Sequence, residues 1–162
     1  MSNEKNVSVI VNGSEVKFVT PSHRTLLEAL RHEGFVEIKC GCEKGDCGAC
    51  AVLLDGEPVD SCLTLAWHVD GREVTTIKGI GHHGKADPLQ KAFIETGAAQ
   101  CGYCTPGIII AAKSLLKDNP NPSLADIKRG LSGNLCRCTG YTRIFEAVQL
   151  AAKELRAEGE AA

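Results

Sequence analysis

Cysteines at regular spacing are the residues of this chain best suited to chemistry. The 162-residue sequence has nine, and Cys42, Cys47 and Cys50 follow the spacing C-x4-C-x2-C, with Cys62 further along. Plant-type [2Fe–2S] sites have this spacing, with three thiolates on one compact loop and the fourth from a neighbouring element. Structural zinc sites also use four thiolates but usually pair two short C-x2–4-C hooks. The first set therefore predicts a [2Fe–2S] cluster rather than zinc.

A second set of four cysteines forms two short hooks. The first hook is C-G-Y-C from Cys101 to Cys104, and the second is C-R-C from Cys136 to Cys138. Each hook precedes an expected helix, whose N-terminal dipole favours a negatively charged thiolate. Two loops at the same end of a helical bundle can bring four sulfurs to one metal centre. Spacing alone leaves both zinc and an iron–sulfur cluster open at this site.

The elements that must position these cysteines change in type near residue 80. In the first half, alternating apolar residues and the dipeptides N-G and D-G predict strands joined by tight turns. Leucines at helical spacing predict one helix. We expect strands at 7–11, 16–19, 51–54 and 74–77, and the helix at 25–32. This order indicates a small mixed α+β domain.

The second half of the chain reads as four short helices. Capping residues or first-turn prolines mark three helix starts, at 87–88, 105–106 and 123–126, and a last helix is expected from 142 to 157. The run G-I-G-H-H-G at 79–84 is typical of a linker, and its two histidines are interpreted as solvated. We therefore expect domains at 1–80 and 85–157, followed by a polar tail at 158–162.

Composition excludes several classes of function. A net charge of −2 and a pI near 6.2 disfavour nucleic acid as a partner, because binding to phosphates needs a basic face. No stretch approaches the ~18 apolar residues of a membrane span, and the polar N-terminus has no signal-peptide core. Clustered cysteines in a cytoplasmic protein more often hold metal than form disulfides. No catalytic triad, phosphate-binding loop or carboxylate pair stands out, so no catalytic residue is assigned.

Three sequence runs resemble one family. They are G-C-E-K-G-D-C-G-A-C (41–50), Q-C-G-Y-C-T-P-G (100–107) and G-N-L-C-R-C-T-G-Y (133–141). Together they are similar to the small iron–sulfur subunit of the molybdenum hydroxylases, the family of xanthine dehydrogenase, carbon monoxide dehydrogenase and aldehyde oxidoreductase. The resemblance extends over most of the chain, from about residue 7 to residue 153.

This resemblance implies an α+β fold, in which a β-grasp, plant-ferredoxin-like domain precedes an all-α four-helix domain. It also implies one [2Fe–2S] cluster in each domain, which favours iron at the second set. The implied metal ligands are Cys42, Cys47, Cys50 and Cys62 in the first domain and Cys101, Cys104, Cys136 and Cys138 in the second.

The same resemblance implies partners and a direction of electron flow. Gln100 and Cys138 match positions that contact the molybdopterin of a large catalytic subunit. Electrons would pass through both clusters toward FAD in a medium subunit or toward another acceptor. The chain would then be a non-catalytic subunit of a cytoplasmic heterotrimer or dimer of heterotrimers. Two other hypotheses are a zinc-stabilised interaction module without redox function and a free-standing ferredoxin-like carrier.

Three residues near the motifs have open or structural interpretations. Cys40 departs from the family pattern as an extra thiol, and we interpret it as a small packed side chain rather than a redox-sensitive thiol or an alternative ligand. Arg137 either tunes the cluster or contacts a partner through its charge, or simply points to solvent. Trp67, the only tryptophan, is interpreted as a packing residue.

Overall fold

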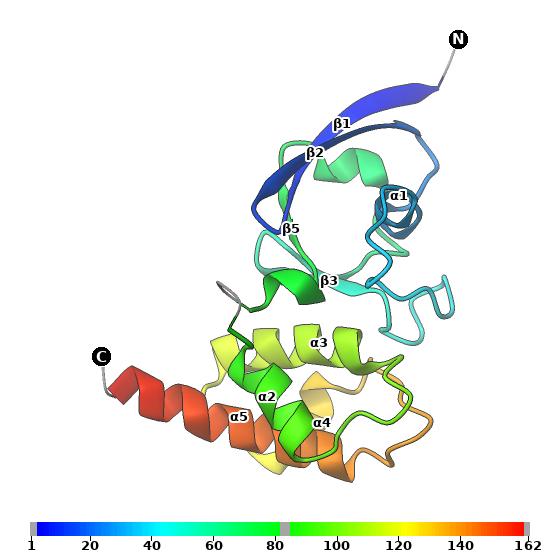
Figure 1. Ribbon diagram of the computed structural model, residues 1–162. Coiled ribbons are helices and arrows are strands. Elements are labelled where there is room, and N and C mark those ends of the chain that lie inside the picture. The colour runs from blue at the N-terminus through cyan, green and yellow to red at the C-terminus, as the bar shows by residue number, and fades with distance from the viewer. Residues whose placement is uncertain (1–2, 82–84, 161–162) are drawn as a thin grey trace.

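The computed structural model describes residues 3–81 and 85–160, without the side chains of 158–160. The described residues form a β-rich domain followed by a helical domain, and Figure 1 shows the first above the second. The α+β architecture expected from the sequence is therefore confirmed. His82 and His83, on which part of the linker interpretation rests, lie outside the described residues.

The first domain is built on a five-stranded mixed sheet in the order β2-β1-β5-β3-β4. Asn12 and Gly13 have positive φ angles of 51° and 81°, as a tight hairpin requires, and they join the antiparallel strands β1 and β2. Asp55 and Gly56 do the same between β3 and β4. The central contact of β1 with β5 is parallel. The strands are β1 (Glu4–Val11), β2 (Ser14–Pro21), β3 (Ala51–Leu54), β4 (Glu57–Asp60) and β5 (Glu73–Thr75).

Helix α1 (Leu26–His32) and the inward face of this sheet enclose the core of the first domain. Thr25 begins the helix with a capping box, in which its side chain and that of Glu28 each bond the other's backbone amide. Trp67 packs against the core, and its indole nitrogen donates to the carbonyl of Thr20 at 2.9 Å. The prediction that Trp67 is a packing residue agrees with this position.

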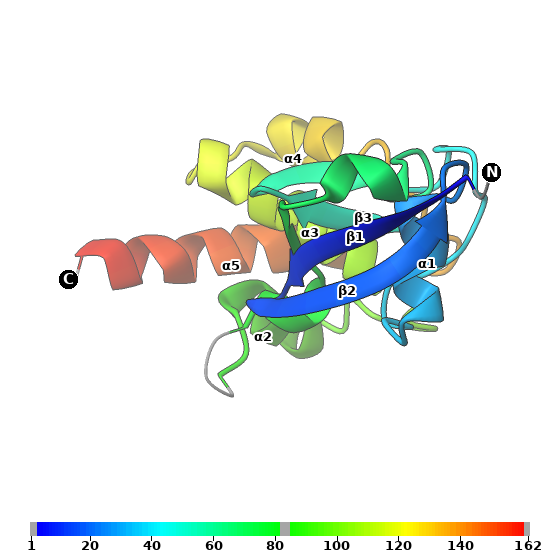
Figure 2. The same ribbon diagram turned by 90° about the horizontal axis from the view of Figure 1, so that it is seen from above.

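In the described part of the second domain, residues 85–160, there are four α-helices, as the sequence predicts. They are α2 (Pro88–Glu95), α3 (Thr105–Asp118), α4 (Leu124–Gly130) and α5 (Thr142–Glu160). Their apolar faces form a separate core in which Leu89, Ile110, Ile127 and Ile144 are fully buried. Figure 2 shows α5 extending past the other helices toward the C-terminus. The helix ends later than the expected residue 157.

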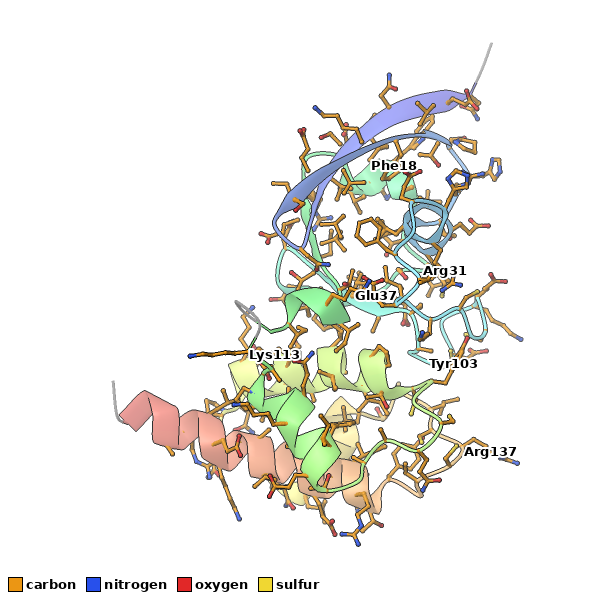
Figure 3. The ribbon with its side chains drawn as sticks, in the orientation of Figure 1. Phe18, Arg31, Glu37, Tyr103, Lys113 and Arg137 are labelled. Atoms are coloured by element: carbon orange, nitrogen blue, oxygen red, sulfur yellow. The ribbon has the colours of Figure 1, made fainter. Side chains whose placement is uncertain are left out.

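The last strand of the sheet is shorter than expected, because Thr76 leaves the ladder. Its backbone amide donates to the Asn12 side chain at 2.8 Å, and its hydroxyl donates to Glu37 Oε1 at 3.0 Å. Thr76 thereby begins the short 3-10 helix η2 (Ile77–Gly79) instead of continuing β5. Glu37 is buried, and Figure 3 shows it between the first-domain core and the helical domain. These bonds connect Glu37, just before the cysteine-containing loop at residues 40–50, with Thr76, just before the segment that leads into the second domain.

The two domains meet where α3 packs against β3 and β4. Helix α3 approaches the first cysteine loop so closely that a methyl group on Gly107 would lie 2.2 Å from the carbonyl oxygen of Gly48. A methyl group on Gly48 would lie 2.4 Å from the side-chain nitrogen of Asn134. Glycine is therefore needed on both sides of the boundary for the backbones to approach this closely.

Candidate metal centres

The first cysteine loop (residues 40–50) is an irregular segment between α1 and β3. Two of its turns need positive φ angles, which are 81° at Gly45 and 64° at Gly48. At Gly41, a methyl group would lie 2.7 Å from Cys47 Sγ, so glycine lets the backbone approach this sulfur. Loops of this kind expose backbone amides toward ligand sulfurs, and the amide of Asp46 donates to Cys42 Sγ at 3.3 Å.

The fourth cysteine of the first set reaches this loop from beyond β4. The hydroxyl of Ser61 donates to the carbonyl of Cys50 at 2.7 Å, which fixes Cys62 beside Cys50. The thiols of Cys50 and Cys62 interact, as do those of Cys42 and Cys47. The four sulfurs predicted from the sequence are thus brought together in two pairs.

The thiols within this set differ in acidity. The backbone amide of Lys44 beside Cys42 lowers the pKa of that thiol to about 7. Burial raises the pKa of the Cys50 thiol to about 12. Thiolates are the form that reacts and that binds metal, so a metal ion would find Cys42 largely ready to bind at neutral pH, whereas Cys50 would have to lose its proton first.

This difference predicts the order of alkylation in the chain after iron removal. At pH 7, iodoacetamide should modify Cys42 at least about tenfold faster than Cys50, because only the first is substantially thiolate. Above pH 8 the rate at Cys42 should level off, while the rate at Cys50 should keep rising. Peptide mass spectrometry over time measures both. In urea the two rates should converge; equal rates in the native buffer would contradict the prediction.

The second set of cysteines lies in two loops that connect helices of the second domain. Cys101 and Cys104 come between α2 and α3, and Cys136 and Cys138 come between α4 and α5. Cys138 Sγ lies 3.6 Å from Cys101 Sγ, and the thiols of Cys104 and Cys136 also interact. Burial raises the pKa of Cys104 to about 12. The two hooks predicted from the sequence therefore also meet as two pairs of sulfurs.

Tyr141 holds the second hook in place. Its hydroxyl accepts from the amide of Cys136 at 2.8 Å and donates to the carbonyl of Asn134 at 3.2 Å. Its ring stacks on Phe145 with centroids 5.9 Å apart. The side chain thus connects the C-R-C hook to α5, a role that the sequence analysis missed although Tyr141 ends the third motif.

Three hydrogen bonds across the domain boundary join the loops that contain the two cysteine sets. The amide of Leu135 donates to the carbonyl of Cys47 at 3.0 Å, and the buried side chain of Asn134 donates to the carbonyl of Gly48 at 3.1 Å. The hydroxyl of Tyr103, between the two cysteines of the C-G-Y-C hook, donates to the carbonyl of Cys40. Figure 1 shows the cyan first loop and the orange second hook on the same side of the molecule. Sequence reasoning missed these contacts, because each links residues more than sixty positions apart.

The donor sets fit two dinuclear iron–sulfur centres. Among the side chains that the structure describes, in residues 3–81 and 85–157, no three histidines, cysteines, aspartates or glutamates are grouped so that they could hold a single metal ion. Two pairs of cysteine sulfurs in each set would supply the four thiolates that hold a [2Fe–2S] centre. Each set also combines one buried or half-buried pair with one more exposed pair.

The residues singled out near the motifs have clear positions. The thiol of Cys40 points to Glu43 Oε1 at 3.0 Å, and that carboxylate raises its pKa. The side chain of Arg137 points away from the helices (Figure 3). Gln100 is exposed at the surface and lies next to Cys101, whose thiol meets that of Cys138. Arg137 therefore lies where it meets solvent or a partner.

Family models for iron–sulfur proteins match both domains. The model described as a 2Fe-2S iron-sulfur cluster binding domain matches residues 9–76, and the one described as a [2Fe-2S] binding domain matches residues 76–149. A two-domain protein with one [2Fe–2S]-binding set in each domain is thus the class that fold and sites define. The choice between zinc and iron at the second set, open from spacing alone, is resolved in favour of iron.

Individual relatives narrow this class further. The nicotinate dehydrogenase small FeS subunit of Eubacterium barkeri is 45% identical over 92% of this chain and 96% of its own length. The xanthine dehydrogenase iron-sulfur-binding subunit of Escherichia coli O157:H7 is 43% identical over 88% and 91%. A crystal structure of quinoline 2-oxidoreductase from Pseudomonas putida 86 contains a chain 40% identical, with a TM-score of 0.91 over 98% of this chain and 99% of that one.

The chain belongs to the small [2Fe–2S] iron–sulfur subunits of the molybdenum hydroxylases, as its three motifs predict. It is accordingly an electron-transfer subunit of an oxidoreductase complex with two [2Fe–2S] domains. This excludes the zinc-stabilised interaction module. Among the described residues, none of the helices has the length and apolar character needed to cross a membrane.

Proposed function

We propose that this chain carries electrons one at a time from a molybdopterin-binding large subunit to a flavin-binding or other acceptor subunit. Its eight ligands are proposed to be Cys42, Cys47, Cys50 and Cys62 for one centre and Cys101, Cys104, Cys136 and Cys138 for the other. When bound, each [2Fe–2S] centre supplies a site that accepts and releases a single electron. The domains proposed to hold them are residues 1–80 and 85–157.

The observation that carries this proposal is the direct hydrogen bonding between the two cysteine sets. Leu135 precedes the ligand Cys136 in the chain, and its amide bonds the carbonyl of Cys47, a ligand of the other set, at 3.0 Å. Tight packing at Gly48 and Gly107 holds the domains in this arrangement. A chain that only presented two separate metal-stabilised domains would not need its ligand loops joined. A fixed, short separation is what stepwise electron transfer requires.

The surface around the second set supports it as the end nearer the molybdopterin. Cys101 and Cys138 are the exposed pair of this set, with Gln100 beside them. Two large apolar side chains, Tyr103 and Leu135, are also exposed here, at 45% and 56%. Exposed apolar residues next to a redox site are typical of a surface that a partner covers. Gln100 and Cys138 are proposed to contact the pterin at this surface.

The surface around the first cysteine loop supports it as the exit. Leu63 is 64% exposed and lies against the turn at Gly45, where a methyl group would be 2.5 Å from its Cδ1 atom. An apolar side chain next to the more exposed pair, Cys42 and Cys47, offers a second place for a partner to dock. A chain with two separate docking surfaces, one beside each cysteine set, can bind two different subunits at once. This is why we propose a cytoplasmic heterotrimer or dimer of heterotrimers rather than a free-standing carrier.

Purification of the intact complex through a tag on this chain tests the proposal. Native mass spectrometry should identify a large and a medium subunit, and metal analysis should give molybdenum and, in this chain, about four irons and four sulfides. Gln100→Ala should weaken retention of the large subunit or of its molybdopterin, while retention of the medium subunit stays unchanged. A chain that elutes alone with both centres intact would instead be a free-standing carrier and would overturn the proposal.

A further inference from the structure

The turn that follows the C-R-C hook places a hydroxyl group against a ligand sulfur. Thr139 Oγ1 lies 3.1 Å from Cys136 Sγ, and the amide of Tyr141 donates to the same oxygen at 3.1 Å. A threonine hydroxyl has one proton and accepts through its lone pairs. Because the oxygen already accepts from Tyr141, its own proton is free to point toward the sulfur. A metal-bound cysteine is a thiolate without a proton, so only Thr139 can be the donor in this contact.

The same turn fixes the direction of this hydroxyl. Gly140 and Tyr141 both have positive φ angles, 62° and 69°, and for tyrosine this is an uncommon conformation. The Tyr141 hydroxyl also fixes the backbone before Thr139, because it accepts from the amide of Cys136 and donates to the carbonyl of Asn134. The backbone on either side of Thr139 is therefore held, and its side chain cannot rotate without losing the bond from the Tyr141 amide.

Thr139 is exceptional among the neighbours of the ligands. Within the described residues, it is the one hydroxyl side chain that hydrogen-bonds a cysteine sulfur. In the first set, the backbone amide of Asp46 donates to the Cys42 sulfur, whereas at Cys50 the thiol itself donates to the carboxylate of Asp60. A side-chain donor can be removed by mutation, whereas a backbone donor cannot, so the second set allows a direct test.

We propose that Thr139 is a positioning residue that donates a hydrogen bond to the Cys136 sulfur and thereby raises the reduction potential of the second [2Fe–2S] centre. The inference rests on the proposed assignment of Cys136 as a ligand. Reduction adds one electron, and much of the added negative charge falls on the sulfurs. A donor at a ligand sulfur stabilises the reduced state more than the oxidised state. The hydroxyl proton stays on Thr139 throughout, so no proton accompanies the electron.

An anaerobic redox titration of the intact complex, followed by electron paramagnetic resonance, tests the inference. Thr139→Val removes the hydroxyl and keeps the shape, and Thr139→Ser keeps the hydroxyl. The midpoint potential of the second centre should shift to more negative values in Thr139→Val and stay near the wild-type value in Thr139→Ser. The first centre serves as an internal reference and should not move in either variant. An unchanged or more positive midpoint in Thr139→Val would overturn the inference.

Iron and sulfide analysis separates this inference from the function on which it rests. If the wild-type chain lacked the second centre, the ligand assignment would be wrong, whatever Thr139 does. Thr139→Ala provides a second variant without a methyl group against the sulfur, should valine prevent assembly. If neither Thr139→Val nor Thr139→Ala assembled the centre and Thr139→Ser did, the hydroxyl would be needed for assembly. That result would overturn a role in setting the potential.

Discussion

Replacing Cys104 by serine is expected to reduce the iron content of the chain from about four to about two atoms and to abolish electron transfer through the complex. Cys104 begins α3, and burial keeps its thiol protonated until a metal displaces the proton. A serine hydroxyl is a far poorer ligand for iron than a thiolate. The first set has separate ligands in another domain, so its centre should remain. Iron analysis and electron paramagnetic resonance of the reduced protein should show one signal lost and one retained.

Cys40→Ser is the matched control, because it makes the same chemical change at the one cysteine that belongs to neither proposed set of four ligands. Its thiol is directed to Glu43, while the thiol of Cys42 meets that of Cys47. Both centres should therefore assemble fully in Cys40→Ser, and electron transfer should continue. Loss of iron from the first set in this variant would show that Cys40, and not Cys42, is a ligand of the first centre. Retention of four irons in Cys104→Ser would contradict the assignment of the second set.

The two cysteine sets could be recognised in the sequence to different degrees, because their members differ in how far apart they lie. Three of the proposed ligands of the first set lie within nine consecutive residues, 42–50, where spacing and glycines determine how the loop wraps. The second set joins hooks with thirty-one residues between them, and only the packing of α3, α4 and α5 brings them together. Spacing could not distinguish zinc from iron there, because either ion accepts thiolates from two hooks. The family resemblance supplied what local chemistry could not.

Most elements of the fold were also predictable, because their signals are local. The caps at Asp87 and Ser123 and the hairpin turns at 12–13 and 55–56 act within four residues and appear where expected. The early end of β5 was not predictable, since it depends on the contact of Thr76 with Asn12 and Glu37, which are far away in sequence. The same is true of Asn134, whose role is visible only when its side chain is seen against Gly48.

The domain boundary should respond strongly to a single methyl group at Gly107. In Gly107→Ala, the new methyl would lie 2.2 Å from the Gly48 carbonyl oxygen and 3.2 Å from the Ala49 Cα atom. Neither atom is at the end of a flexible side chain, so α3 and the first cysteine loop must move apart. Overpacking of this kind typically costs about 1–3 kcal/mol. Alanine is otherwise favoured over glycine in a helix by about 1 kcal/mol, so the observed loss is a net value.

Gly133→Ala is the matched control for this substitution. Gly133 is in the same boundary region, but a methyl group there meets nothing within 4 Å, and its φ angle is not positive. Its stability should stay within about 0.5 kcal/mol of the wild type. Gly107→Ala should lower the melting temperature by about 2–4 °C per kcal/mol lost, measured by thermal unfolding of the holoprotein. Equal melting temperatures for both variants would show that the domain boundary accommodates the Gly107 methyl group without loss of stability.

The same pair of variants can separate stability from electron transfer. Movement of α3 away from the first loop also strains the bonds from Asn134 to Gly48 and from Leu135 to Cys47, which join the two cysteine sets. We therefore expect Gly107→Ala to keep both centres and their ligands but to slow the passage of electrons between them, as measured by rapid-mixing spectroscopy of the complex. Gly133→Ala should transfer electrons at the wild-type rate. An unchanged rate in a destabilised Gly107→Ala would mean that transfer does not depend on contact between the loops.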